Sequence, residues 1–241
     1  MPHELISFSS PAELAGEVAR RWRDRIHTAA LAGTSHRVAL SGGRIAVDLF
    51  QAAAALETPG ATSPDWDRVE FFWGDERCVP PDDPDSNFHA VSRTLLGPLG
   101  ISDSRIHRIA GELDPIEAAR RASETLRSLA PVGSDGVPVL DLVLLGMGED
   151  GHIASLFPGA GPAVEGAREP FIAVIGPKPP PQRVTLTYPT LAAAREVWVL
   201  VSGSGKENAL HNSMANGGLT PLGRLLRLRD AVVFSSVNWV G

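Results

Sequence analysis

The chain has 241 residues, of which 43% are hydrophobic and 21% charged, with a formal net charge of −6 at pH 7. These values are typical of a soluble globular protein with a sizeable core, and the negative charge argues against non-specific nucleic-acid binding. The single cysteine, Cys78, excludes an intrachain disulfide and a thiolate metal cluster. We find no signal-peptide pattern and no uncharged apolar run long enough for a bilayer. We therefore expect a cytoplasmic protein without membrane or nucleic-acid partners.

Helix and strand patterns alternate from the start of the chain. Residues 10–13 combine a Ser cap, a Pro at the first helical position and a Glu that closes a capping box. Apolar residues then recur every four positions as far as Ile26, which predicts one buried helix face. Residues 38–40 are typical of a short buried strand, residues 46–57 of a helix, and the Pro, Gly and Asp content of 58–67 predicts a loop.

The alternation continues to the end of the chain. A capped start predicts a helix over 86–96, and a second capping box at 114–117 opens a helix that ends near Leu129. The most apolar segment, 139–146, is typical of a central parallel strand. Further strands are expected at 68–76, 170–176, 183–188, 196–203 and 231–240, and a further helix at 205–217.

This order of elements implies right-handed crossovers and a mostly parallel sheet. We expect one α/β domain over residues 1–241, with or without a small C-terminal lobe. Polar turns follow predicted strands at 41–44, 74–77, 146–152 and 202–206. Because ligands of open α/β sheets bind outside the carboxyl ends of the strands, these turns are expected to converge on one edge.

Two of these turns have the character of an anion site. In the first, Gly42 and Gly43 leave backbone N–H groups free at a helix start, and Arg44 adds a planar donor fork suited to phosphate. In the second, glycines lead to Lys206 near another helix start, without the spacing of a Walker A loop. Either turn alone is equally consistent with a solvated surface cation, but the two together favour an anion. Arg183, at the mouth of a strand, is either a third ligand or a surface charge.

The turn at 146–152 contains the spacing G-x-G-x-x-G, which also occurs in dinucleotide-binding proteins. Glu149 and Asp150 would put negative charge where a pyrophosphate binds, so we rank a nicotinamide site low. His152, close to Asp150 on a glycine-shaped turn, is suited to act as a general base near neutral pH. The alternative is a histidine that only hydrogen-bonds its own loop. Ser155 lacks the G-x-S-x-G elbow of serine hydrolases.

Three charged residues, Asp75, Glu76 and Arg77, follow a strand together. They either supply an acid or orienting carboxylate with an electrophile or anion clamp, or form only a local salt-bridge turn. We expect the neighbouring Cys78 to be a buried, inert thiol. The aspartates of residues 82–85 alternate with proline and lack partners, so we expect a solvated loop there and no metal site.

Several segments in the same order resemble the 6-phosphogluconolactonase family, from about Val38 to about Leu210. The resemblance implies the modified Rossmann-like α/β sandwich shared with glucosamine-6-phosphate deaminase. It also implies hydrolysis of 6-phosphogluconolactone to 6-phosphogluconate in the oxidative pentose phosphate pathway, without a metal or organic cofactor. The segments are WGDERCVPPDDPDSNFH, LDLVLLGMGEDGHIASLFPG, KPPPQRVTLTYPTL and EVWVLVSGSGKENAL.

Matched by motif, the family's D-G-H histidine is His152 and its aspartate is Asp150. The D-E-R triplet corresponds to residues 75–77, and the positions of Arg183 and Lys206 resemble phosphate ligands of the deaminase relatives. The family's first loop usually reads S-G-G-S-T-P, whereas residues 44–46 here are Arg, Ile and Ala. Two hydroxyls and a helix-starting proline are therefore absent, and Arg44 either replaces their grip on phosphate or leaves it weaker. The expected phosphate ligands are Gly42, Gly43, Arg44, Arg183 and Lys206.

The resemblance and the residues together give a mechanistic hypothesis. Neutral His152 takes a proton from water, the water attacks the lactone carbonyl, and His152 then protonates the leaving ring oxygen. Either Asp75 or Asp150 orients the imidazole, and Arg77 or loop amides stabilise the oxyanion.

Other functions stay open at this point. A sugar-phosphate isomerase or deaminase of the same fold would use Asp75 as a carbon-acid base, and a non-catalytic sensor would bind a sugar phosphate without turnover. We expect a monomer or weak homodimer whose partner is a small sugar phosphate lactone.

Overall fold

The computed structural model describes residues 3–57, 66–215 and 218–237. Its centre is a six-stranded sheet in which every pair of neighbouring strands is parallel. The expected α/β class with a mostly parallel sheet is therefore confirmed. In spatial order the strands are β1 (Glu4–Ser7), β9 (Val232–Ser235), β8 (Glu196–Val201), β5 (Leu142–Gly146), β2 (His36–Leu40) and β3 (Val69–Trp73).

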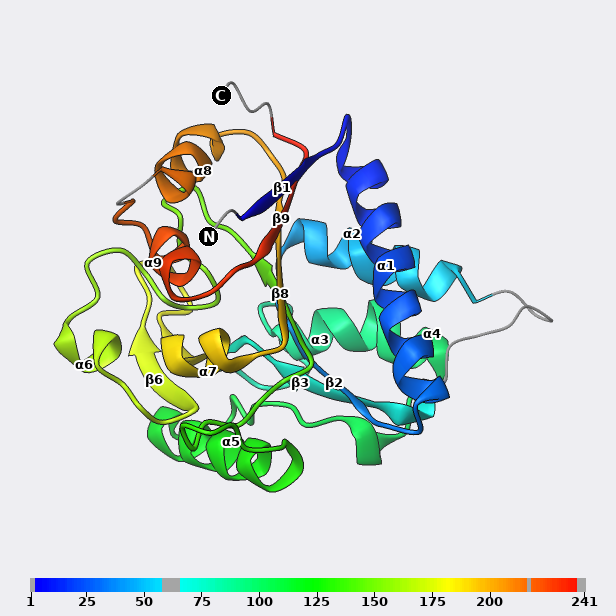
Figure 1. The fold of residues 1–241 in the computed structure, drawn as a ribbon. Coiled ribbons are helices and arrows are strands. Elements are labelled where there is room, and N and C mark those ends of the chain that lie inside the picture. Colours follow the sequence, from blue (N-terminus) through cyan, green and yellow to red (C-terminus); the bar gives the residue numbers. More distant parts are fainter. Residues whose placement is uncertain (1–2, 58–65, 216–217, 238–241) are drawn as a thin grey trace.

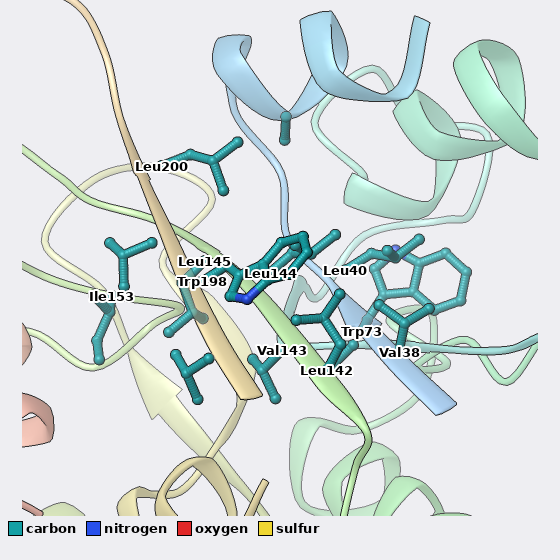
Figure 2. Close-up of a cluster of buried hydrophobic side chains, with 14 of the residues drawn as sticks. Val38, Leu40, Trp73, Leu142, Val143, Leu144, Leu145, Ile153, Trp198 and Leu200 are labelled. Carbon is teal, nitrogen blue, oxygen red and sulfur yellow. The ribbon is translucent and has the colours of Figure 1, made fainter. Parts of the chain in front are cut away.

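The middle of this sheet forms the core of the protein. Side chains of residues 142–145 in β5 are all buried, as expected for a strand covered on both faces. Figure 2 shows them between Val38 and Leu40 of β2 and Trp198 and Leu200 of β8. The rigid middle strands fix the loops that leave their carboxyl ends.

Helices cover the sheet on both sides (Figure 1). Helix α1 (Pro11–Leu31) begins where the capping pattern predicts it, because the Ser10 side chain accepts the Glu13 N–H. Its apolar face is buried against the sheet and against α2 (Arg44–Ala55). Figure 1 shows α7 (Tyr188–Ala193) and α9 (Pro221–Leu228) on the opposite side.

A second sheet of three antiparallel strands departs from the expected order. It consists of β4 (Asp75–Arg77), β7 (Gln182–Leu186) and β6 (Phe171–Ile175). The expectation of a polar turn at 74–77 was wrong, because residues 75–77 leave the main sheet and form a strand of the second one. The sheet is covered by α5 (Pro115–Leu129), whose N-terminus is capped by Asp114.

Both ends of the described chain join the main sheet, since β1 pairs with β9. The predicted strand 183–188 ends at Leu186, and Tyr188 already belongs to α7. The loop predicted at 58–67 and the segments 216–217 and 238–241 lie largely or wholly outside the described residues. The described helices include none that is both long and apolar enough to cross a membrane. The remaining elements are η1 (Trp66–Arg68), α3 (Asn87–Val91), η2 (Ser92–Leu96), α4 (Gly97–Leu99), η3 (Asp103–Arg105), α6 (Pro162–Glu165) and α8 (Glu207–Met214).

Candidate active site

A cavity of about 340 Å³ opens at the carboxyl ends of β2, β5 and β8, with one wall formed by β4 and β7. The four polar segments therefore converge on one edge as expected, although residues 75–77 reach it as a strand. Every residue expected in the site lines the cavity except Asp150, which contacts it through His152. The predicted residues on the wall are Gly42, Gly43, Arg44, Asp75, Arg77, His152, Arg183 and Lys206.

The turn before α2 presents free backbone donors to the cavity. Gly43 is the N-cap of this helix, and within the described residues no side chain caps its first turn. Gly43 has φ 101°, a conformation that residues with a Cβ rarely adopt. The exposed N–H groups and the helix dipole together favour a bound anion at this position.

Two cations stand beside this turn. Arg44 is exposed and Lys206 is half-buried, and neither forms a hydrogen bond or ion pair with any residue in the described part of the chain. Burial lowers the pKa of Lys206, nearby Arg44 lowers it further, and Glu149 acts in the opposite direction. The Arg44 guanidinium lies near Gly203, where a Cβ would be 3.7 Å from its Nη2. Two neighbouring cations without a partner are suited to a multiply charged anion.

A second pair of cations comes from the antiparallel sheet, where Arg77 and Arg183 are directly opposite in the β4–β7 register. Arg183 is buried, so its interpretation as a surface charge was wrong. Its Nε donates to the Pro180 carbonyl at 3.2 Å, and its guanidinium lies 5.7 Å from the centre of the Phe157 ring. Burial and the Arg77 charge lower the pKa of Arg183. Arg77 donates to the Asp85 carbonyl at 2.6 Å.

His152 pairs with Asp150 at the cavity wall. The two side chains are 2.6 Å apart, between Nδ1 and Oδ1, and the same carboxylate oxygen accepts the His152 N–H at 3.1 Å. Partial burial opposes ionisation of Asp150, but the hydrogen bonds from His152 outweigh it and lower its pKa. The imidazole also packs on Phe157, with ring centres 4.8 Å apart. A Cβ at Gly148 would be 2.1 Å from Nδ1, so this close approach requires glycine there.

Asp75 is the other carboxylate considered for orienting His152, and it is engaged elsewhere. It is 5% exposed, one carboxylate oxygen accepts the Ser155 hydroxyl at 2.7 Å, and the other accepts the Asn87 amide at 3.3 Å. The contact with His152 therefore belongs to Asp150, while Asp75 links β4 to two neighbouring segments.

Glu76 and Cys78, which lie close to Asp75 in the sequence, have structural roles. Glu76 does not line the cavity, and its buried carboxylate accepts the backbone N–H groups of residues 77, 87 and 88. Burial raises the pKa of Glu76, and these hydrogen bonds oppose the shift. Cys78 is partly buried and not fully buried as expected, but this burial raises its pKa to about 11, which agrees with an inert thiol. In the described residues no group of three or more His, Cys, Asp or Glu side chains is arranged to hold a metal ion.

Several cavity residues were not identified as site residues from the sequence. Ser41 has a buried hydroxyl without a hydrogen-bond partner among the described residues, and Ala154 has φ 47°, unusual for a residue with a Cβ. Asn87 is almost fully buried yet lines the cavity. Its position ten residues after Arg77 was the available signal in the sequence for a place in the site. Asp48, one turn into α2, also lines the wall.

Comparisons with known proteins agree with this architecture. Residues 9–233 match the family described as glucosamine-6-phosphate isomerases/6-phosphogluconolactonase. The 6-phosphogluconolactonase of Streptomyces coelicolor is 37% identical over 222 residues, which are 89% of this chain and 84% of that protein. The one from Mycobacterium tuberculosis is 37% identical over 229 residues, 92% and 89% of the two chains.

Solved structures extend the similarity to three dimensions. The 6-phosphogluconolactonase of Trypanosoma brucei has a TM-score of 0.81 at 29% identity, covering 97% of this chain and 95% of that one. The enzyme of Trypanosoma cruzi has a TM-score of 0.82 at 27% identity, covering 97% and 94%. With the family match spanning most of the sequence, the chain belongs to the glucosamine-6-phosphate isomerase/6-phosphogluconolactonase family.

Proposed function

We propose that this protein hydrolyses 6-phospho-D-glucono-1,5-lactone to 6-phosphogluconate, the reaction for which its relatives are named. The reaction belongs to the oxidative pentose phosphate pathway. One observation carries the proposal: His152, which is hydrogen-bonded to Asp150, lines the same cavity as Arg44 and Lys206, two cations that have no ion pair with a described residue. A base and an anion site in one cavity match a substrate that carries a phosphate and a hydrolysable ester.

The phosphate is proposed to bind at the start of α2. The N–H groups of Gly42 and Gly43 donate to its oxygens, and Arg44 and Lys206 neutralise its charge. Arg183 borders the same cavity beside Phe157, so it contacts the phosphate or the sugar according to how the substrate lies.

His152 is proposed as the general base. Its Nδ1–H donates to Asp150, which leaves Nε2 to take a proton from water as that water attacks the lactone carbonyl carbon. Arg77 or loop amides stabilise the negative oxygen that forms. When the bond from carbon to the ring oxygen breaks, the imidazolium returns its proton to that oxygen, and 6-phosphogluconate is released.

The test is acid release from freshly generated 6-phosphogluconolactone, measured above its spontaneous hydrolysis, with the His152→Ala protein as the control. If acid is released in the presence of wild-type protein no faster than by spontaneous hydrolysis, the proposal is contradicted. Glucosamine 6-phosphate is the second substrate, since ammonia release would indicate a deaminase. The hydrogen bonds that hold Asp75 to Ser155 and Asn87 disfavour its use as a carbon-acid base.

We also propose that residues 1–241 form one cytoplasmic domain, monomeric or weakly dimeric. The pairing of β1 with β9 supports a single unit, because both ends of the described chain contribute to one sheet. Sedimentation velocity across a concentration series measures the oligomeric state.

A further inference from the structure

Asn87 lies between Asp75 and the backbone of Gly42. It is 4% exposed, and its Nδ2 donates to the Asp75 carbonyl at 2.9 Å and to the Asp75 carboxylate at 3.3 Å. Both partners are acceptors only, so the amide nitrogen has to face Asp75. The amide oxygen then lies on the other side, toward Gly42.

The amide of Asn87 occupies the space next to the Gly42–Gly43 turn, where phosphate is proposed to bind. A Cβ at Gly42 would be 1.9 Å from Asn87 Oδ1 and 2.6 Å from its Cγ. Glycine at position 42 is therefore required by this side chain, and the Asn87 amide packs against the backbone proposed to bind phosphate.

The same network extends to the loop that carries His152. The Asp75 oxygen that is not bonded to Asn87 accepts the Ser155 hydroxyl at 2.7 Å, and the Ser155 N–H donates to Thr185 Oγ1 at 3.1 Å. Ser155 follows Ala154, the cavity residue with φ 47°, so these bonds hold a strained loop in place.

Asn87 is itself fixed from behind. The Glu76 carboxylate accepts the N–H of Asn87 and of Phe88 at 2.8 Å each, and the Ser86 hydroxyl at 3.1 Å. The position of the Asn87 side chain is thus determined by buried hydrogen bonds, not by contact with solvent.

We propose that Asn87 is a positioning residue. Acting through Asp75 and Ser155, it couples the Gly42–Gly43 turn to the loop that carries His152. Through this coupling, a substrate bound by its phosphate presents its carbonyl to His152. The inference rests on the proposed function and adds the residue that holds the two halves of the site in register.

Asn87→Asp tests the inference because it keeps the shape and replaces the donor. An ionised carboxylate at position 87 faces the acceptors of Asp75, whereas a protonated one donates as the amide does. Burial beside Asp75 raises the pKa of the new carboxyl. We therefore expect kcat/KM of the variant, divided by that of wild type at the same pH, to rise on the order of tenfold from pH 8 to pH 6. Dividing by wild type removes the pH dependence that the two proteins share.

Two further variants complete the test. Asn87→Ala is expected to raise KM and lower kcat, with a ratio to wild type that does not change with pH. Asn212→Asp is the matched control, because Asn212 is exposed and does not line the cavity, and its ratio should stay flat. Thermal unfolding verifies that each variant is folded.

A flat ratio for Asn87→Asp, or changes of less than twofold in both constants for Asn87→Ala, would overturn the inference. If Asn87→Asp does not fold, the Asn87→Ala constants decide. If wild type hydrolyses no lactone, the proposed function fails, and the positioning role is then judged by 6-phosphogluconate affinity. The ratio of the variant's Kd to that of wild type should still fall between pH 8 and pH 6, and a constant ratio would overturn it.

Discussion

The two ends of the parallel strands carry similar residues in opposite states. At the amino ends, Asp141 binds Arg37 and Arg195, and Glu196 binds Arg25. At the carboxyl ends, four cations border the cavity, and none of them has an ion pair with a described residue. Charges at the first end are neutralised within the protein, and at the second they are left for a ligand. Pairing, more than residue type, separates a stabilising cluster from a binding site.

Two histidines show the same contrast. His36, at the start of β2, is buried and accepts a hydrogen bond from Trp22 Nε1 at 3.3 Å. Burial lowers the pKa of His36 to about 4, so it stays neutral and structural. His152, past the end of β5, is half-buried, contacts a carboxylate and faces a cavity. Only the second environment can stabilise an imidazolium formed during a reaction.

The largest expected effect comes from removing the base at the carboxyl ends. His152→Ala should lower kcat by roughly a hundred- to ten-thousand-fold, since general-base assistance is lost. Asp150→Asn should lower kcat less, because the imidazole remains but its charged form loses a partner. Steady-state hydrolysis corrected for the spontaneous reaction measures both. Retention of most of the wild-type rate by His152→Ala would refute the assignment.

The next effect concerns stability at the amino ends. The pKa of His36 is lowered from 6.5 to about 4 in the folded protein, so the unfolded chain binds the proton more readily. Stability present above pH 6.5 is therefore lost as the pH falls toward 4, by roughly 3 kcal/mol. His36→Gln keeps an acceptor for Trp22 and removes the titration. Denaturant unfolding from pH 7 to pH 4 should show a shallower loss in the variant, and parallel curves would contradict this.

Lys206→Ala tests whether a cation without an ion pair at the carboxyl ends binds the phosphate. The loss of a charge-assisted hydrogen bond to phosphate should raise KM by roughly 10- to 100-fold with a smaller change in kcat. Lys178→Ala is the control, because this lysine is not among the residues that line the cavity. An unchanged KM in Lys206→Ala would place the phosphate elsewhere.

Arg44→Ser should have the smallest effect of the series. Arg44 is exposed, so solvent screens its charge, and we expect KM to rise by less than about tenfold. A KM equal to that of wild type would mean that Arg44 does not contact the phosphate.

Sequence alone determined the features that depend on neighbouring residues. The apolar period of α1, its Ser10 cap and the polar turns after β2, β5 and β8 are encoded within a few positions. The closeness of Asp150 to His152 is equally local, because the two residues are two positions apart on a glycine turn, but the sequence left Asp75 as an alternative partner. The family motifs identified the same residues.

Only the tertiary structure decided contacts between distant segments. The second sheet places Arg77 opposite Arg183, and Ser155 meets Asp75 across 80 positions of sequence. The contacts of Asp75 with Ser155 and Asn87, which exclude it as the partner of His152, therefore could not be read from residue types. These contacts depend on an antiparallel register and on buried hydrogen bonds, which form only once the parallel sheet has brought the loops together.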